Sequence, residues 1–108
     1  MMDAAGWRRV LGLVGLGVRG RLAVVGVERV REAAAKGTLR YAIVAGDASP
    51  HSLAKVVPLL RAKGIPLLRG VGAVELGGVT GRDATAVVGI VDAQLAKGIR
   101  GVVDAAGA

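Results

Sequence analysis

The chain has 108 residues, a formal net charge of +7 and 53% hydrophobic residues, which predict one folded domain over residues 1–108 and exclude a disordered chain. It contains no cysteine and a single histidine, at position 51, so we expect no disulfide, no metal site and no cofactor. The longest uncharged run, residues 10–18, is too short to cross a membrane, and a cytoplasmic protein is the default expectation.

The positive charge is concentrated in the N-terminal part of the chain. Residues 1–40 contain eight Lys and Arg but three acids, Asp3, Glu28 and Glu32. A small basic domain indicates a polyanionic partner, most commonly nucleic acid. Trp7 and Tyr41 are the sole aromatic residues, so stacking of bases on aromatic rings is nearly excluded. An arginine-rich solvated surface without a partner is the alternative explanation of this charge.

The first forty residues predict two helices and a strand. Apolar residues at helical spacing predict a first helix from about Ala5 to Leu16, which several glycines weaken, and a turn over residues 17–20. Residues 22–25 predict a short strand that ends at Gly26. An amphipathic basic helix is expected over residues 27–36, with Gly37 at its C-terminus.

The rest of the chain continues this alternation of strands and helices. Residues 40–45 predict a buried strand. Ser49 is expected to cap a third helix that starts at Pro50, has a kink at Pro58 and ends at Gly64. Residues 65–68 predict a short strand, and the glycines that follow predict a loop-rich region with one helical turn over residues 73–76.

The C-terminal part is expected to contain a long strand over the apolar residues 84–91 and a short helix over residues 93–97. Asp92 is placed to cap that helix, and the tail over residues 102–108 is expected to fray. Strands that alternate with helices favour a sheet covered by helices on both faces.

The start of the second predicted helix is the strongest candidate site. A glycine at this position leaves the N–H groups of the first turn unpaired, and such groups suit a phosphate or the edge of a base. Glu28 and Arg29 both fall in that first turn. The helix dipole favours Glu28 but not Arg29, which indicates an external anionic partner for Arg29. Arg31 and Lys36 are interpreted as part of a solvated face.

Two other motifs would indicate an enzyme, the first as a dinucleotide-binding loop and the second as a catalytic group. Residues 15–20 match G-x-G-x-x-G, but a strand rather than a helix follows, and no acidic residue stands about twenty positions further on. A flexible helix-to-strand connection is the favoured interpretation. Asp47, Ser49 and His51 lie too close in sequence to form a triad, and the first two suit a turn and a helix cap.

Short motifs along the chain, from about Trp7 to Gly98, together resemble the ribosomal kink-turn-binding superfamily and, within it, the bacterial YlxQ-type proteins. Their order and spacing are more specific than any one of them. The matching segments are Leu11-Gly12-Leu13, Ala45-Gly46-Asp47-Ala48-Ser49, Gly64-Ile65-Pro66, Glu75-Leu76-Gly77 followed by Gly81, and Asp92 before a short helix.

The resemblance implies an α/β fold, a three-layer α/β/α sandwich around a small mixed sheet of about four strands. It also implies a non-catalytic ribonucleoprotein component that binds a kinked RNA stem-loop in a ribosome-associated or RNA-processing context. In RNA-binding relatives a G-x-N-E-x-x-K pattern at the second helix contacts sheared G·A pairs, and a later loop holds a flipped nucleotide. Gly26 matches the glycine, while Glu28, Arg29 and Glu32 stand at the Asn, Glu and Lys positions.

We therefore predict a non-enzymatic RNA-binding domain whose partners are structured RNA and ribosome-associated proteins. Gly26 is expected to lie at an exposed helix start beside the Gly70–Gly72 loop. The predicted RNA-binding residues are Arg19, Arg21, Arg29 and Arg69 for phosphates, Gly26, Gly70, Val71 and Gly72 for close approach, and Glu28 and Glu32 at the same surface. The alternatives are a protein-interaction module that lost RNA recognition and a nucleotide-binding enzyme that uses Gly15–Gly20.

Overall fold

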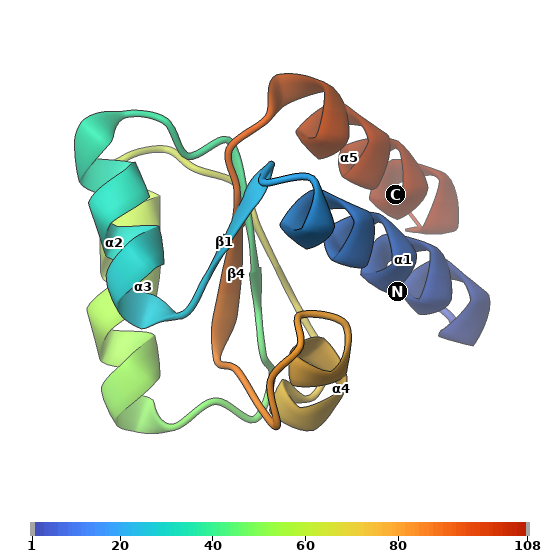
Figure 1. Ribbon diagram of the computed structural model, residues 1–108, viewed down its shortest axis with the longest axis horizontal. Coiled ribbons are helices and arrows are strands. Elements are labelled where there is room, and N and C mark those ends of the chain that lie inside the picture. The colour runs from blue at the N-terminus through green and yellow to red at the C-terminus, as the bar shows by residue number, and fades with distance from the viewer. Residues whose placement is uncertain (1, 108) are drawn as a thin grey trace.

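A mixed four-stranded sheet lies between two layers of helices in the computed structural model, which describes residues 2–107 (Figure 1). The strands are β1 (Ala23–Val25), β2 (Tyr41–Val44), β3 (Leu67–Arg69) and β4 (Val87–Ile90), in the spatial order β1-β4-β2-β3. β4 pairs antiparallel with β1 and β2, whereas β2 and β3 are parallel. The C-terminal ends of β1, β2 and β3 therefore lie at the same end of the sheet as the start of β4.

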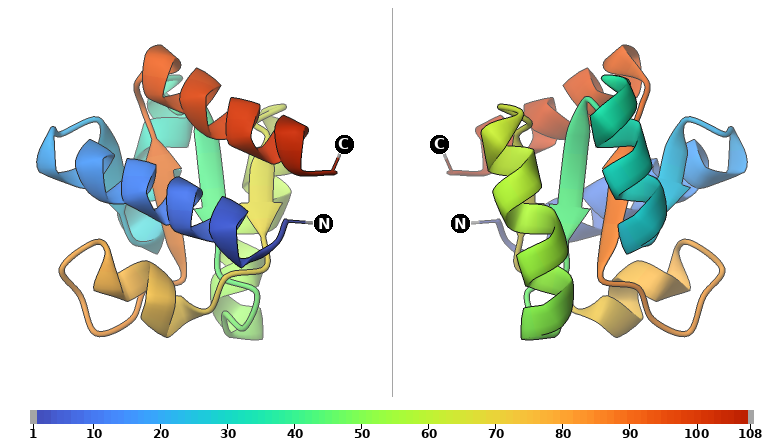
Figure 2. Two further views of the ribbon diagram at one scale, coloured as in Figure 1. Left: turned by 90° about the vertical axis from the view of Figure 1, so that its right-hand side faces the viewer. Right: turned by 90° about the vertical axis from the view of Figure 1, so that its left-hand side faces the viewer.

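Helices cover both faces of this sheet (Figure 2). α2 (Val27–Lys36) and α3 (Pro50–Ala62) pack on one face, and α1 (Ala4–Arg19), α4 (Ala73–Gly78) and α5 (Ala93–Gly107) pack on the other. Alternate residues of β2 enter opposite cores, because successive side chains of a strand point to opposite faces. Tyr41 and Ile43 join the α1–α5 core, and Ala42 and Val44 join the α2–α3 core. The predicted three-layer α/β/α sandwich is confirmed.

The helix ends follow the capping residues of the sequence. α2 begins after Gly26 and ends at Gly37, which has a positive φ of 75°. The Ser49 Oγ accepts from the N–H of Ser52 at 3.1 Å, and the Asp92 Oδ2 accepts from the N–H of Leu95 at 2.9 Å. These caps confirm the predicted starts of α3 and α5. α3 continues past Pro58 to Ala62.

Two helices are longer than the sequence predicted. α1 continues through Gly17 to Arg19, so the expected turn begins only at Gly20. Gly17 faces α5, and a Cβ added to it would meet the end of the Leu95 side chain. The glycine thus permits close packing of two helices instead of ending one. α5 likewise runs past Lys97 to Gly107, and its Val102 is buried in the core, so the predicted frayed tail is wrong over the described residues. Ala108 lies outside the described residues.

The last strand is shorter than predicted, because its first apolar residues belong to a loop. Residues 79–86, here called the 79–86 loop, fold back on α4. A Cβ on Gly77 would lie 2.6 Å from the Cα of Ala84, so the two backbones touch. The N–H of Arg82 donates to the carbonyl of Gly77 at 3.0 Å, and the N–H of Thr85 donates to the carbonyl of Ala73 at 3.0 Å.

Within residues 2–107, no helix combines the length and apolar character that a membrane crossing requires.

Candidate nucleic-acid interface

The start of α2 is open, as the sequence predicted. Gly26 adopts φ 100° and ψ 160°, no side chain caps the helix, and a Cβ at Gly26 would meet nothing within 4 Å. The Gly26 N–H donates to the carbonyl of Val87 at 3.0 Å, which fixes the chain where β1 leaves the sheet. The N–H groups of Val27, Glu28 and Arg29 lie in the first turn, where an α-helix offers them no internal acceptor. This end of α2 therefore presents donors and a positive dipole to a ligand.

A pocket of about 410 Å³ lies beside this helix start. Three guanidinium groups line it, from Arg21 before β1, Arg29 in α2 and Arg82 in the 79–86 loop. Its apolar lining includes Val18 of α1 and Val24 of β1. We call it the arginine pocket. Among the described residues none of its three arginines forms an ion pair, so their charges are available to an anion.

The backbone holds Arg21 in an uncommon conformation. Its φ of 62° is in the left-handed region, which costs a residue with a Cβ about 1–2 kcal/mol. Arg19 lines a neighbouring pocket of about 470 Å³ between α1 and the 79–86 loop. The two pockets share Val18 and Thr80, so Arg19 extends the same cationic surface along α1.

The two acids predicted at this surface are paired with lysines and do not line the arginine pocket. Glu28 lies 3.7 Å from the Nζ of Lys55 in α3, and Glu32 lies 2.9 Å from the Nζ of Lys36. The hydrogen bond from Lys36, together with its charge, holds the pKa of the Glu32 carboxyl below its usual value. Arg29 therefore lines the arginine pocket, whereas the two acids of the same helix lie beside lysines.

The Gly70–Gly72 segment is not beside Gly26, contrary to the geometry expected from the sequence. Gly26 follows β1 and Gly70 follows β3, which are the two edge strands, so β4 and β2 lie between them. Arg69 and Gly70 are exposed at that far edge, while the Val71 side chain is buried in the core with 4% exposure. A Cβ on Gly70 would lie 3.0 Å from the indole ring of Trp7.

The structure gives structural roles to the residues that were weighed as catalytic. The Asp47 Oδ1 accepts from the N–H of Ala73 at 2.8 Å, which caps α4 across two loops, and Ser49 caps α3. Gly15 and Gly17 are buried within α1 and form no phosphate loop, which removes the basis for the nucleotide-binding alternative. Over residues 2–107, no three His, Asp or Glu side chains gather where they could hold a metal ion.

Sequence reasoning missed two residues of this surface, Thr80 and Arg82. Both were assigned to a glycine-rich loop whose position in space was unknown. The available signal was an arginine between Gly81 and the apolar run 84–91, in a segment where the chain must reverse. The Thr80 hydroxyl is 3.0 Å from the carbonyl oxygen of Gly77, which fixes this loop against α4.

The fold and this surface define a three-layer α/β protein with a cationic face suited to a polyanion. A family model described as the ribosomal protein L7Ae/L30e/S12e/Gadd45 family matches residues 10–100. The chain belongs to this family, which confirms the superfamily resemblance of its motifs and agrees with the expectation of a non-catalytic, ribosomal-type protein.

Two solved structures are similar to this chain. A protein of unknown function from Bacillus halodurans has a TM-score of 0.81 and 27% identity, with 89% of this chain and 97% of that chain covered. A 15.5kD RNA binding protein from Giardia lamblia also has a TM-score of 0.81, with 20% identity and coverage of 96% and 89%. The second likeness is one of fold. No curated protein matches the chain.

Proposed function

We propose that this protein binds structured RNA through the arginine pocket and the open start of α2. The observation that carries this proposal is a pocket lined by Arg21, Arg29 and Arg82, all without an ion pair among the described residues, next to an uncapped helix N-terminus. Membership of a ribosomal-protein family and a fold shared with an RNA-binding protein of Giardia lamblia support it.

The chemistry of the pocket suits a nucleotide that has left its stack. Val18, Ala23 and Val24 offer an apolar surface to a base, which compensates for the absence of aromatic rings there. The guanidinium groups and the free N–H groups of α2 suit its phosphates, through charge-assisted hydrogen bonds and the helix dipole. Single-stranded loops and bulges supply such splayed nucleotides, whereas a regular duplex does not.

This requirement favours a kinked or bulged RNA, such as a kink-turn, over a plain duplex. The Asn, Glu and Lys of the family pattern are replaced here, so the specificity we propose depends on the pocket and its arginines. We further propose one domain over residues 1–108, a cytoplasmic location, ribosomal RNA or an RNA-processing complex as the context, and ribosome-associated proteins as further partners. Arg69 and Gly70–Gly72, at the far sheet edge, are proposed to contact only a longer RNA.

Fluorescence anisotropy with a kinked stem-loop and a plain duplex tests the proposal. Arg29→Gln and Arg82→Gln should each weaken binding of the stem-loop and lower its salt slope by about 1, because each removes one phosphate contact. Arg61→Gln, at the exposed end of α3, makes the same charge change and should leave the affinity nearly unchanged.

Equal binding of the two RNAs by the unmodified protein would contradict the kinked-RNA proposal. Equal loss in all three variants would reduce the effect to net charge. The surviving alternative is a protein-interaction module, favoured by the acids at positions 28 and 32. Capture of a protein partner that resists nuclease, without RNA binding in the anisotropy assay, would support that alternative.

A further inference from the structure

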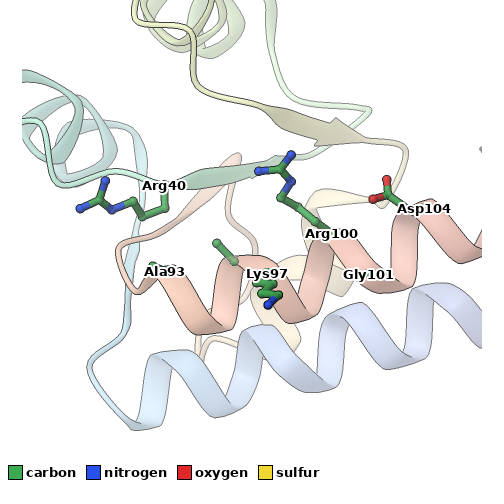
Figure 3. A pocket seen from close by; sticks show the side chains of 7 residues that line it. Arg40, Ala93, Lys97, Arg100, Gly101 and Asp104 are labelled. Carbon is green, nitrogen blue, oxygen red and sulfur yellow. The ribbon is translucent and has the colours of Figure 1, made fainter.

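A second cationic surface lies over α5, on the face of the sheet that α1 and α5 cover. It is a groove of about 490 Å³ over α5, lined by Arg40, Lys97 and Arg100 and, nearer the end of α5, by Asp104. Arg40 directly precedes β2, and α5 follows β4, so this groove lies at the end of the sheet where β2 begins and β4 ends. Figure 3 shows Arg40 on one side, Arg100 rising from α5 and Asp104 beyond it. We call it the α5 groove.

The charges of the α5 groove are not used by the fold. Within residues 2–107, Arg40, Lys97, Arg100 and Asp104 form no ion pair, and the side chains of all four residues carry no hydrogen bond. Three cations and one carboxylate leave a net charge of +2 around an open groove. Lys97 and Arg100 are three residues apart on one helix, which separates them by about 4.5 Å along its axis.

The floor of the groove is made of small side chains. Ala93, Ala96 and Gly101 contribute it, and they allow a ligand backbone to approach the helix closely. The lining offers no aromatic or large apolar side chain. Aromatic anchors in buried pockets, which are common among protein–protein hot spots, are absent from this lining, so charge is the main attraction that the groove offers. A sugar–phosphate backbone needs only the charge and the open floor.

We propose that the α5 groove binds the phosphate backbone of an RNA segment that lies outside the arginine pocket. The inference rests on the proposed function in taking RNA as the partner, but it concerns a different surface. The two surfaces have no lining residue in common, so a single short stem-loop fills the first, and a longer or second helical segment reaches the second. Asp104 repels phosphate and therefore limits the groove at its C-terminal end.

The test uses the full chain, a plain RNA duplex that lacks a bulge and a kinked stem-loop as a second probe. The double variant Lys97→Gln/Arg100→Gln should bind the duplex about ten-fold more weakly, with a salt slope lower by about 2. Arg61→Gln/Lys63→Gln is the matched control, since it removes the same charge at the end of α3, and should bind the duplex as the unmodified chain does. Asp104→Asn should strengthen duplex binding two- to three-fold.

The outcomes separate this inference from the proposed function. Equal losses in the test and control doubles overturn the inference, because net charge alone then explains them. The inference is also overturned if Lys97→Gln/Arg100→Gln binds the duplex as the unmodified chain does. If Arg29→Gln and Arg82→Gln weaken stem-loop binding in the same experiment, the proposed function still stands. If Lys97→Gln/Arg100→Gln loses binding to poly-glutamate but binds RNA unchanged, the partner of the groove is an acidic protein and the inference is overturned. Thermal unfolding of every variant confirms that the fold is retained.

Discussion

Replacement of Gly26 by alanine isolates the backbone conformation on which the candidate interface depends. At φ 100° and ψ 160° the residue occupies a region that is essentially restricted to glycine, at a cost of about 1–3 kcal/mol for other residues. An added Cβ would meet no atom within 4 Å, so steric collision contributes nothing. Gly26→Ala should therefore lower the free energy of unfolding by about 1–3 kcal/mol from backbone strain alone.

Gly98 of α5 supplies the matched control, because a Cβ there also meets nothing within 4 Å but the backbone is helical. Gly98→Ala should raise the free energy of unfolding by about 0.8–1 kcal/mol. Urea denaturation followed by circular dichroism measures both, and each kcal/mol corresponds to about 4–8 °C in Tm. The same chemical change must act with opposite sign at the two positions. If both variants are stabilised, Gly26 is not held at a positive φ and the account of the α2 start is wrong.

Three further predictions concern the cap, the strained arginine and the buried phenol. Asp47→Ala removes the acceptor of the Ala73 N–H and should cost about 1 kcal/mol of stability in urea denaturation, an effect that unchanged stability would refute. Arg21→Gly relieves a φ of 62° and should leave Tm equal or higher while it weakens RNA binding, so a clear loss of stability would contradict the assigned strain. Burial raises the pKa of Tyr41 above its usual 10, so the unfolded chain ionises first and stability should fall above about pH 10. Tyr41→Phe should make that alkaline fall shallower, and an identical pH profile in the variant would refute it.

The parts of the fold that the sequence predicted best are those fixed by local chemistry. α2 was predicted residue for residue, because Gly26 and Gly37 mark its two ends. α1 was predicted too short, because glycines weaken a helix in isolation but Gly15 and Gly17 here face other elements. α5 was predicted too short, because the burial of Ile99 and Val102 in the core extends it past Gly98. β4 was predicted too long, because apolar periodicity does not distinguish a buried strand from a loop packed on α4.

The candidate site was predicted only in part, for a topological reason. The helix start at Gly26 and the arginines at positions 21 and 29 follow from local sequence, and their placement agrees with the structure. The loop that completes the surface depends on the strand order β1-β4-β2-β3, in which the last strand lies next to the first. No local pattern encodes that neighbourhood, so Arg82 was missed and the loop after β3 was chosen instead.

Ultraviolet crosslinking of the full chain to RNA in cells, with the crosslinked peptides and the RNA both identified, is the decisive test of RNA binding at the arginine pocket. We expect crosslinks on the segment from Arg21 to Arg29 and on the 79–86 loop, to nucleotides that are unpaired within structured RNA. Crosslinks confined to the α2–α3 face, or a chain that recovers no RNA above background, would contradict it.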